Sequence, residues 1–142
     1  MNAIQQLTEQ HRLCDADFAI AETAVRQGDW PKARAVFQAF HNGMLQHFAL
    51  EEDSLFPAFE AATGSQMGPT MVMRNEHSQM RALMQDMAQL LSSEHAGDYL
   101  GCADTLLILM QQHNMKEENI LYPMCSQHIT GFADLVAAGA AA

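Results

Sequence analysis

The most constraining feature of this 142-residue chain is a phrase that occurs twice. Residues 47–57 read HFALEEDSLFP and residues 113–123 read HNMKEENILYP, so both follow the pattern His-x-x-x-Glu-Glu-(Asp/Asn)-x-Leu-(Phe/Tyr)-Pro. The second copy begins 66 positions after the first, and the same offset carries His11 onto His77. A repeat that copies histidine and glutamate along with apolar residues predicts two related halves around a shared metal site.

Composition and charge narrow the class of protein. Apolar residues make up 49% of the chain, and a formal net charge of −10 opposes binding to nucleic acid and to anionic membranes. No apolar stretch approaches the length that a membrane span needs. The cysteines Cys14, Cys102 and Cys125 are odd in number and widely spaced, unlike a disulfide framework. We therefore expect a cytoplasmic protein with reduced thiols and no nucleic-acid or membrane partner.

Glycine and proline divide the chain into four long segments whose apolar residues recur in alternating steps of three and four. This spacing is typical of helices packed in a bundle. With short connections, it predicts an all-α, antiparallel, up-down four-helix bundle over residues 1–129, followed by a short C-terminal tail over 130–142. Continued past the repeated glutamates, the same spacing predicts that four further residues face the core: Ser54, Ala58, Ile120 and Met124.

Six polar residues interrupt the apolar faces of these helices and should point into the bundle. The distances from the turns bring all six to one layer, to within about one helical turn. A buried, unpaired carboxylate costs several kcal/mol, so these residues either satisfy one another or bind a cation. Six in one duplicated layer favour the cation, and nitrogen and oxygen donors favour iron, manganese or zinc. The predicted metal ligands are His11, His47, Glu51, His77, His113 and Glu117.

On these residues, the sequence resembles the hemerythrin-like (HHE cation-binding) family, four-helix bundles that hold a non-haem di-iron centre. The resemblance covers residues 4–125 and is most specific in HFALEEDSLFP, RNEHSQMR and HNMKEENILYP, with His11 in EQHRL completing the set. It implies that the four histidines are terminal iron ligands and that Glu51 and Glu117 are bridging carboxylates.

Two departures from the oxygen-carrying hemerythrins bear on function. Those proteins have a second histidine one turn after the third-helix histidine, where this chain has Arg81, which cannot ligate. They also place the fourth-helix acid one residue later, at Glu118, whereas the internal symmetry with Glu51 favours Glu117. The missing histidine leaves an open coordination position or one that another acid fills. The candidates for that role are Glu52, Glu118, Asp15 and Glu76.

The resemblance implies two non-haem iron ions joined by an oxo or hydroxo bridge, with zinc or manganese as alternatives. We expect a protein that binds or reacts with dioxygen, peroxide or nitric oxide in sensing, storage, detoxification or iron handling. The sequence leaves open whether that reaction is catalytic. The alternative is a regulatory or scaffolding bundle in which a structural metal, such as zinc, has no redox chemistry.

Several residues near the layer are open to two interpretations. Tyr122 replaces Phe56 in the repeat, which favours a packing role over a catalytic phenol. Arg81 and Asp15 are related by the repeat offset, and either pair across the site or reach solvent.

His41 and Cys14 are the remaining ligand-type residues close to the predicted site. His41 lies about 9 Å along the helix from its nearest predicted ligand and has no equivalent at the repeat offset, so we expect it to flank the layer. Cys14 follows the first histidine by one turn on the inward face. We expect a small buried hydrophobic residue there, with a redox role near the metal as the alternative.

Overall fold

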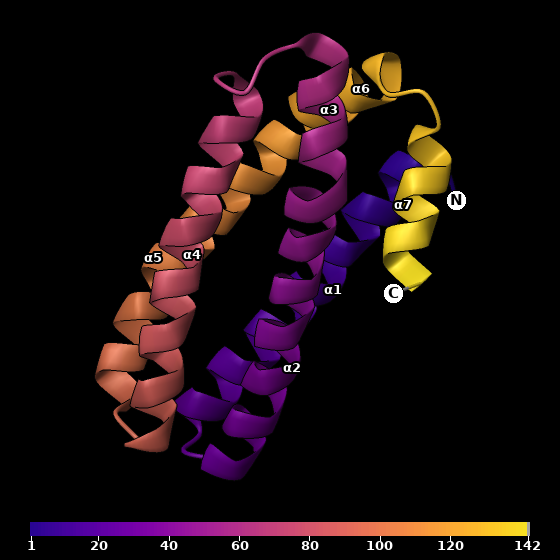
Figure 1. Ribbon diagram of the computed structural model, residues 1–142. Coiled ribbons are helices and arrows are strands. Elements are labelled where there is room, and N and C mark those ends of the chain that lie inside the picture. Colours follow the sequence, from indigo (N-terminus) through magenta and orange to yellow (C-terminus); the bar gives the residue numbers. More distant parts are fainter. Residues whose placement is uncertain (142) are drawn as a thin grey trace.

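The computed structural model describes residues 1–141, which fold into four long helical rods that run antiparallel (Figure 1). This confirms the predicted all-α bundle. No helix in the described range combines the length and the apolar character that crossing a bilayer requires. The rods are α1 (Ala3–Arg26); α2 (Trp30–Leu50) continuing through the π-helix η1 (Glu51–Leu55) into α3 (Phe56–Thr63); α4 (Pro69–Ser92); and α5 (Ala96–Lys116) continuing through the π-helix η2 (Glu117–Leu121) into α6 (Tyr122–His128).

The turns between the rods follow from local residue chemistry. Gly28 has a φ of 72° and Gly64 a φ of 70°, a left-handed conformation that strains residues with a Cβ atom. Asp29 caps α2 by accepting a 3.3 Å hydrogen bond from the backbone N–H of Lys32. Pro31 stands in the first turn, where the helix needs no amide donor. Because these connections are short, α1 packs against α2 and α4 against α5.

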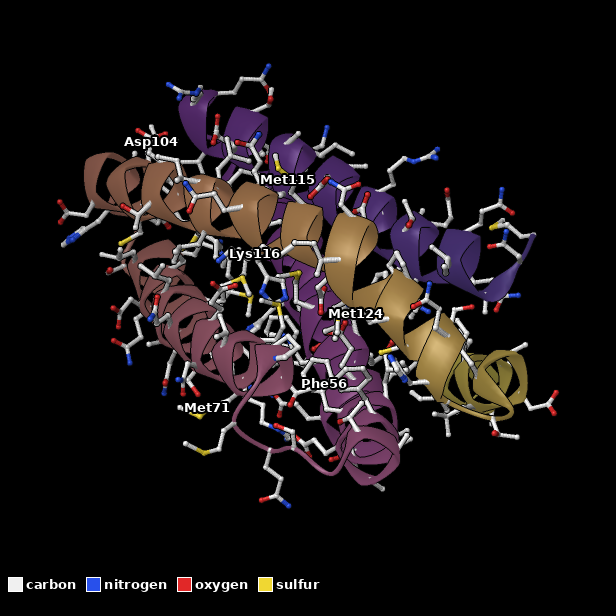
Figure 2. All side chains as sticks on the ribbon, turned by 90° about the horizontal axis from the view of Figure 1, so that it is seen from above. Phe56, Met71, Asp104, Met115, Lys116 and Met124 are labelled. Atoms are coloured by element: carbon white, nitrogen blue, oxygen red, sulfur yellow. The ribbon has the colours of Figure 1, made fainter. Side chains whose placement is uncertain are left out.

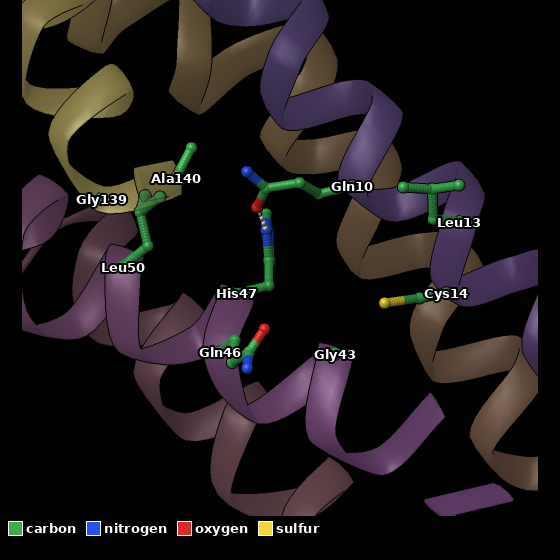
Figure 3. A pocket seen from close by; sticks show the side chains of 9 residues that line it. All are labelled: Gln10, Leu13, Cys14, Gly43, Gln46, His47, Leu50, Gly139 and Ala140. Carbon is green, nitrogen blue, oxygen red and sulfur yellow. Dashed lines mark hydrogen bonds between the residues drawn. The ribbon is translucent and has the colours of Figure 1, made fainter. Parts of the chain in front are cut away.

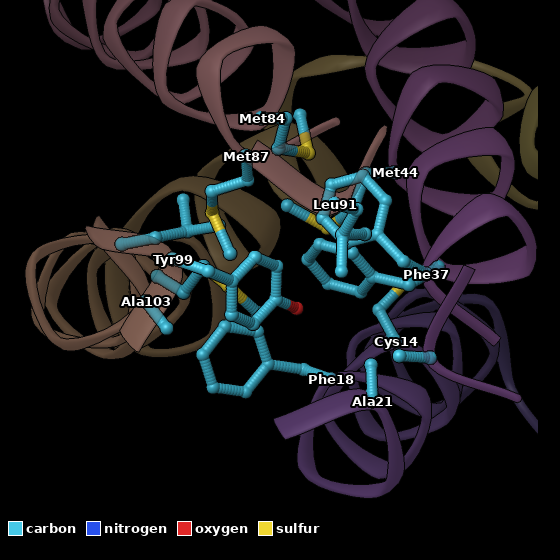
Figure 4. Packing of buried hydrophobic residues seen from close by; sticks show 14 of the residues in the cluster. Cys14, Phe18, Ala21, Phe37, Met44, Met84, Met87, Leu91, Tyr99 and Ala103 are labelled. Carbon is cyan, nitrogen blue, oxygen red and sulfur yellow. The ribbon is translucent and has the colours of Figure 1, made fainter. Parts of the chain in front are cut away.

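The hydrophobic core consists of two clusters at different heights in the bundle. We call one the Met-rich cluster, which draws on α1, α2, α4 and α5 and includes Phe18, Phe40, Met80, Met84, Met87 and Met110 (Figure 4). We call the other the terminal cluster, which includes Leu7, Leu55, Phe56, Phe59, Leu121 and Val136. The methionines of the Met-rich cluster fill its interior. The side chains of Met71 and Met115 instead point away from the bundle and are 40% and 62% exposed (Figure 2). The histidines and glutamates of the repeated phrases lie between the two clusters.

Both repeated phrases leave the α-helical pattern at the same place. The backbone N–H of Phe56 donates to the carbonyl of Glu51, and that of Tyr122 donates to the carbonyl of Glu117, a spacing of five residues instead of four. A proline follows each of these residues and has no N–H with which to continue the ladder. Each rod therefore takes up one additional residue directly after its inward glutamate.

The additional residue changes which side chains face the core beyond the metal layer. Leu55 and Phe59 in the second rod, and Leu121 and Cys125 in the fourth, are at most 2% exposed. Each lies one position later than uninterrupted α-helical spacing predicts. The prediction for the four residues one position earlier was therefore wrong, because it assumed a continuous α-helix. Ile120 is 55% exposed, and the other three, Ser54, Ala58 and Met124, are only partly buried.

The last described residues form a helix where the sequence predicted a tail. After Gly131, whose φ is 77°, α7 (Phe132–Ala141) turns back and lies alongside the N-terminal part of α1 (Figure 1). Phe132 and Val136, four residues apart, are buried in the terminal cluster. Leu135 also packs against this cluster, so burial of apolar side chains docks the short helix.

Candidate metal centre

The six predicted ligands lie in one buried layer, and all four rods contribute. α1 supplies one histidine and α4 another, while the second and fourth rods each supply a histidine and the glutamate that begins the π-helix. Their exposed fractions range from 0% to 5%. The residues brought together are His11, His47, Glu51, His77, His113 and Glu117.

The ligand atoms form two groups that share one carboxylate. Within each group, one donor atom from every residue lies within 4.8 Å of the others. We call them the α1/α2 half, after the helices that carry His11 and His47, and the α4/α5 half, after those that carry His77 and His113. Glu117 belongs to both groups, and Glu51 to the group of the α4/α5 half.

The two carboxylates each face histidines of both halves. Oε1 of Glu51 lies 3.1 Å from Nε2 of His77, and Oε2 lies 3.4 Å from Nε2 of His47. Oε1 of Glu117 lies 3.1 Å from Nε2 of His11 and 3.2 Å from Nε2 of His113. Burial would raise the pKa of Glu117, but hydrogen bonds with Glu51 and with these histidines hold it well below its ordinary value. An ionised carboxylate in this position can neutralise cations on either side.

Two carboxylate oxygens in the layer have no hydrogen-bond donor among the described residues, Oε1 of Glu51 and Oε2 of Glu117. A buried carboxylate oxygen without a partner is costly unless a cation satisfies it. The imidazoles present a similar deficit. Nε2 of His11 lies 3.0 Å from Nε2 of His47, so the two nitrogen atoms need a proton or a metal between them. The donor set therefore fits bound cations.

In each ligand histidine, the ring nitrogen that faces away from the layer, Nδ1, forms a hydrogen bond that orients the ring. Nδ1 donates to an oxygen of a neighbouring rod at 2.6–2.8 Å in all four cases. This fixes the tautomer in which Nε2 carries the lone pair that ligates metal. The pairs are His11 with Glu118, His47 with Gln10, His77 with Glu52, and His113 with Glu76. Three of the four candidate additional ligands, Glu118, Glu52 and Glu76, thus orient histidines. Of the two adjacent glutamates in the fourth rod, Glu117 points into the layer and Glu118 does not.

The outer acids of the α4/α5 half are themselves paired with cations. Arg81 donates to both oxygens of Glu52, at 3.0 and 2.8 Å, and Lys116 donates to Glu76 at 2.5 Å. Burial would raise the pKa of each acid, but these hydrogen bonds outweigh it and lower both values. The hypothesis that Arg81 pairs with Asp15 was wrong, because Glu52 on the adjacent rod offers a bidentate partner.

Without a cation, the layer holds protons tightly. Burial would lower the pKa of His47, but the charge of Glu51 and hydrogen bonds to Glu117 and Glu51 raise it to about 10. His113 shows the same balance, with Glu117 as the main group that raises its pKa above the ordinary value. Metal must therefore displace protons from this layer when it binds.

The family comparison agrees with this geometry. The family model described as "Hemerythrin HHE cation binding domain" matches residues 2–125, nearly the whole chain. This protein belongs to the hemerythrin HHE cation-binding domain family. No curated protein matches the chain as a relative. The buried histidines and glutamates of the layer are thus the metal-site candidates of an HHE domain, and they fit that role in position and chemistry.

One residue of this HHE domain reaches the layer although the sequence predicted only packing. The hydroxyl oxygen (Oη) of Tyr122 donates to Oε2 of Glu51 at 2.8 Å and lies 3.1 Å from Nε2 of both His11 and His47. Burial, followed by the charges of Glu117 and Glu51, raises the pKa of Tyr122 well above its ordinary value. The sequence feature that could have indicated this role is that the two repeated phrases differ here by one hydroxyl group, at Phe56 and Tyr122.

A cavity of about 230 Å³ reaches the HHE site from the side of α1 and α2 (Figure 3). His47 and its partner Gln10 line it, with Cys14 and the end of α7 at Gly139. Burial and the neighbouring Asp15 and Asp17 raise the pKa of Cys14 to about 12, so this thiol stays protonated at neutral pH. That supports a packing role over a redox one.

His41 lies outside the metal layer, as expected for a flanking residue. Its ring packs against Phe37, with 5.6 Å between the ring centroids, at the height of the Met-rich cluster. The side chain is partly buried, and burial lowers the pKa of its imidazole. This histidine is therefore a suitable control residue for experiments on the ligands.

Proposed function

We propose that each half of the layer holds one non-haem iron ion and that the pair binds or reacts with dioxygen, peroxide or nitric oxide. The main support for this proposal comes from the contacts of the two glutamates. Both Glu51 and Glu117 face histidines of the two halves at 3.1–3.4 Å, as two carboxylates bridging a pair of cations would. Six inward donors exceed the needs of one closed tetrahedral site.

The donor types support iron. Imidazole nitrogen and carboxylate oxygen suit iron, manganese and zinc, whereas softer metals select thiolates and thioethers. When bound, an iron pair supplies open coordination positions and exchangeable electrons for a small oxidant or gas. Compared with the oxygen-carrying hemerythrins, this chain lacks one histidine ligand, because Arg81 stands in its place. The coordination position left open favours reaction with a small ligand over dedicated oxygen transport.

The residues of the chain itself exclude water and restrict the size of the ligand. The ring of Phe48 stacks on His77 with 3.9 Å between centroids, and that of Phe56 lies 5.6 Å from it on a similar plane. Both phenylalanines are at most 1% exposed. The wall of the α4/α5 half is therefore apolar and closely packed, which favours small, weakly hydrated ligands over bulky ones.

Metal analysis of the purified protein, combined with an optical spectrum after aerobic loading with iron, tests this proposal. We expect about two iron ions per chain and the near-ultraviolet and visible absorption of an oxo-bridged ferric pair. His41→Ala is the matched control and should give the same content and spectrum. One iron per chain under iron-replete conditions would contradict the paired site. Retention of colourless zinc in preference to iron would support a regulatory or scaffolding bundle instead.

We also propose that the protein works in a reducing compartment such as the cytoplasm. Cys14, Cys102 and Cys125 are all free in the structure, and free thiols persist where glutathione and thioredoxin keep them reduced. Cell fractionation tests this location, and recovery from an oxidising compartment would contradict it.

A further inference from the structure

Tyr122 enters the metal layer from the end of the fourth rod, directly after η2. Its side chain is fully buried, and its ring stacks on His11 with centroids 5.8 Å apart and planes inclined by 23°. Besides the contacts with Glu51 and the two histidines of the α1/α2 half, its hydroxyl lies 3.0 Å from Oε1 of Glu117. One oxygen atom thus lies 2.8–3.1 Å from four predicted ligand atoms.

These separations match those of donors around a single cation. Two donors that each lie about 2.1 Å from a metal, at a right angle, are about 3.0 Å apart. The other contacts in this half have similar lengths, with 3.0 Å between Nε2 of His11 and His47 and 3.1 Å between Nε2 of His11 and Oε1 of Glu117. The phenol oxygen therefore occupies one coordination position (a corner) of the same donor set. The outer acids differ, because they contact the histidines only at their Nδ1 atoms.

The repeat supplies an internal comparison for this corner. Phe56, the equivalent of Tyr122, stacks on His77 with centroids 5.6 Å apart and planes inclined by 24°, nearly the geometry of Tyr122 on His11. The two rings are therefore placed alike, and the two halves differ at this corner by a hydroxyl group. The α1/α2 half has an oxygen donor there, and the α4/α5 half has only a ring C–H.

We propose that Tyr122 is a metal ligand of the α1/α2 half and that the open position for the small ligand lies in the α4/α5 half, beside Phe56. This deepens the proposed function and rests on it for the identity of the metal. The proton that the phenol now donates to Glu51 leaves to solvent when the cation binds, and the oxygen then ligates as phenolate. A nearby cation favours this loss, as it does for bound water and thiols.

Ferric loading of the wild type and of Tyr122→Phe tests the ligand role. We expect a visible phenolate-to-iron(III) charge-transfer band in the wild type, with tyrosinate ring vibrations enhanced in resonance Raman spectra excited in that band. Tyr122→Phe should lose both signals and bind its α1/α2 ion at least tenfold more weakly. Phe56→Tyr is the matched variant and should intensify both signals, because it adds a phenol at the equivalent corner.

Zinc gives a second readout that does not depend on iron. Adding zinc to the metal-free wild type should produce the ultraviolet difference absorption of one tyrosinate, and Tyr122→Phe should lack it. If the chain bound two irons but showed neither the charge-transfer band nor the zinc-induced tyrosinate, Tyr122 would be a hydrogen-bond donor only. If iron failed to bind while zinc still produced tyrosinate, the iron function would fail and the ligand role would stand. Both wild-type measurements remain decisive even if a variant does not fold.

Azide, a small anionic probe, tests which half is open. Phe56→Tyr should abolish azide binding to the ferric protein, because its hydroxyl would occupy the open corner. Tyr122→Phe should still bind azide, since the corner beside Phe56 is unchanged. Loss of azide binding in Tyr122→Phe with retention in Phe56→Tyr would reverse the assignment of the open position.

Discussion

The two halves of the metal layer have matching histidines, and both face the same two carboxylates, but their surroundings differ in charge. In the α4/α5 half, the outer acids Glu52 and Glu76 are each paired with a cation, Arg81 and Lys116. These four charges sum to zero. The histidines of that half are thus oriented by carboxylates whose charge is already compensated.

The α1/α2 half has different residues at every equivalent position but one. The repeat offset relates Arg81 to Asp15, Lys116 to Leu50, and Glu76 to Gln10, while Glu52 corresponds to Glu118. Among the described residues, neither Asp15 nor Glu118 forms an ion pair with a lysine or an arginine, and Glu118 contacts only His11. Burial and the charge of Glu118 raise the pKa of Asp15, against the charge of His11. The repeat therefore keeps the donors and varies the charge around them. A more negative surrounding favours the more highly charged state of a bound cation.

Removing a shared carboxylate should have the largest effect, because it acts on both halves. Glu117→Ala should reduce the metal content from about two ions per chain to below one, as measured by elemental analysis after dialysis, since Glu117 contacts histidines of both halves. Glu118→Ala, the neighbouring control, removes only the outer partner of His11 and should keep both ions. The assignment of the inward acid would be wrong if Glu118→Ala lost the metal and Glu117→Ala kept it.

Removing one terminal histidine should affect one half. His77→Ala and His11→Ala should each leave about one ion per chain, because the other half retains its own pair of histidines and the two carboxylates. Elemental analysis gives the content, and Mössbauer spectra of the iron-57 protein show whether the remaining ion is unpaired. His41→Ala should retain both ions. If either ligand variant lost all metal, the halves would not bind independently.

Exchanging the outer partners should change affinity more modestly. Glu76→Gln gives His113 the neutral partner that His47 has in Gln10, and should weaken binding in the α4/α5 half about tenfold, a typical effect of an outer partner. Gln10→Glu makes the opposite exchange and should strengthen binding in the α1/α2 half. Competition with a chelator of known affinity measures both changes. Equal affinities in all three proteins would show that these partners position the rings without tuning them.

The smallest effects should come from charges outside the hydrogen bonds to histidine. Arg81→Gln should keep both ions and lower the reduction midpoint of the centre, because Glu52 loses its compensating charge. Asp15→Asn should raise the midpoint. Each change should amount to about 1 kcal/mol at a partly screened site. A mediated redox titration measures both, and shifts of the same sign would contradict the charge comparison.

Much of the fold and the membership of the layer could be predicted from periodicity. Three breaks at glycine or proline define four helices, and the offset of 66 residues aligns the ligand types on facing rods. The ligand pattern is readable because histidine and glutamate are expensive to bury and stand out on an apolar face.

The π-helices could not be predicted from apolar spacing. In both phrases the residues around the insertion include adjacent large apolar side chains, Leu55-Phe56 and Leu121-Tyr122, so a shift by one residue leaves the pattern plausible. The roles of Tyr122 and Arg81 depended on contacts between rods that a single sequence does not specify. Tyr122 and Phe56 occupy the same place in the repeat, so the pattern alone predicts the same packing role for both and no separate role for the hydroxyl.

The paired π-helices also make the metal layer the place where the helical phase changes. Up to Glu51 and Glu117 the rods follow the phase of the Met-rich cluster, and beyond them they follow a phase displaced by one residue, about 100° around the helix axis. Deleting one residue inside η1, such as Asp53, would restore uninterrupted α-helical spacing and keep every ligand, with Leu55 and Phe59 still facing the terminal cluster. The metal content and the stability of this deletion variant would therefore show what the π-helix itself contributes, apart from the donor atoms and the packed side chains.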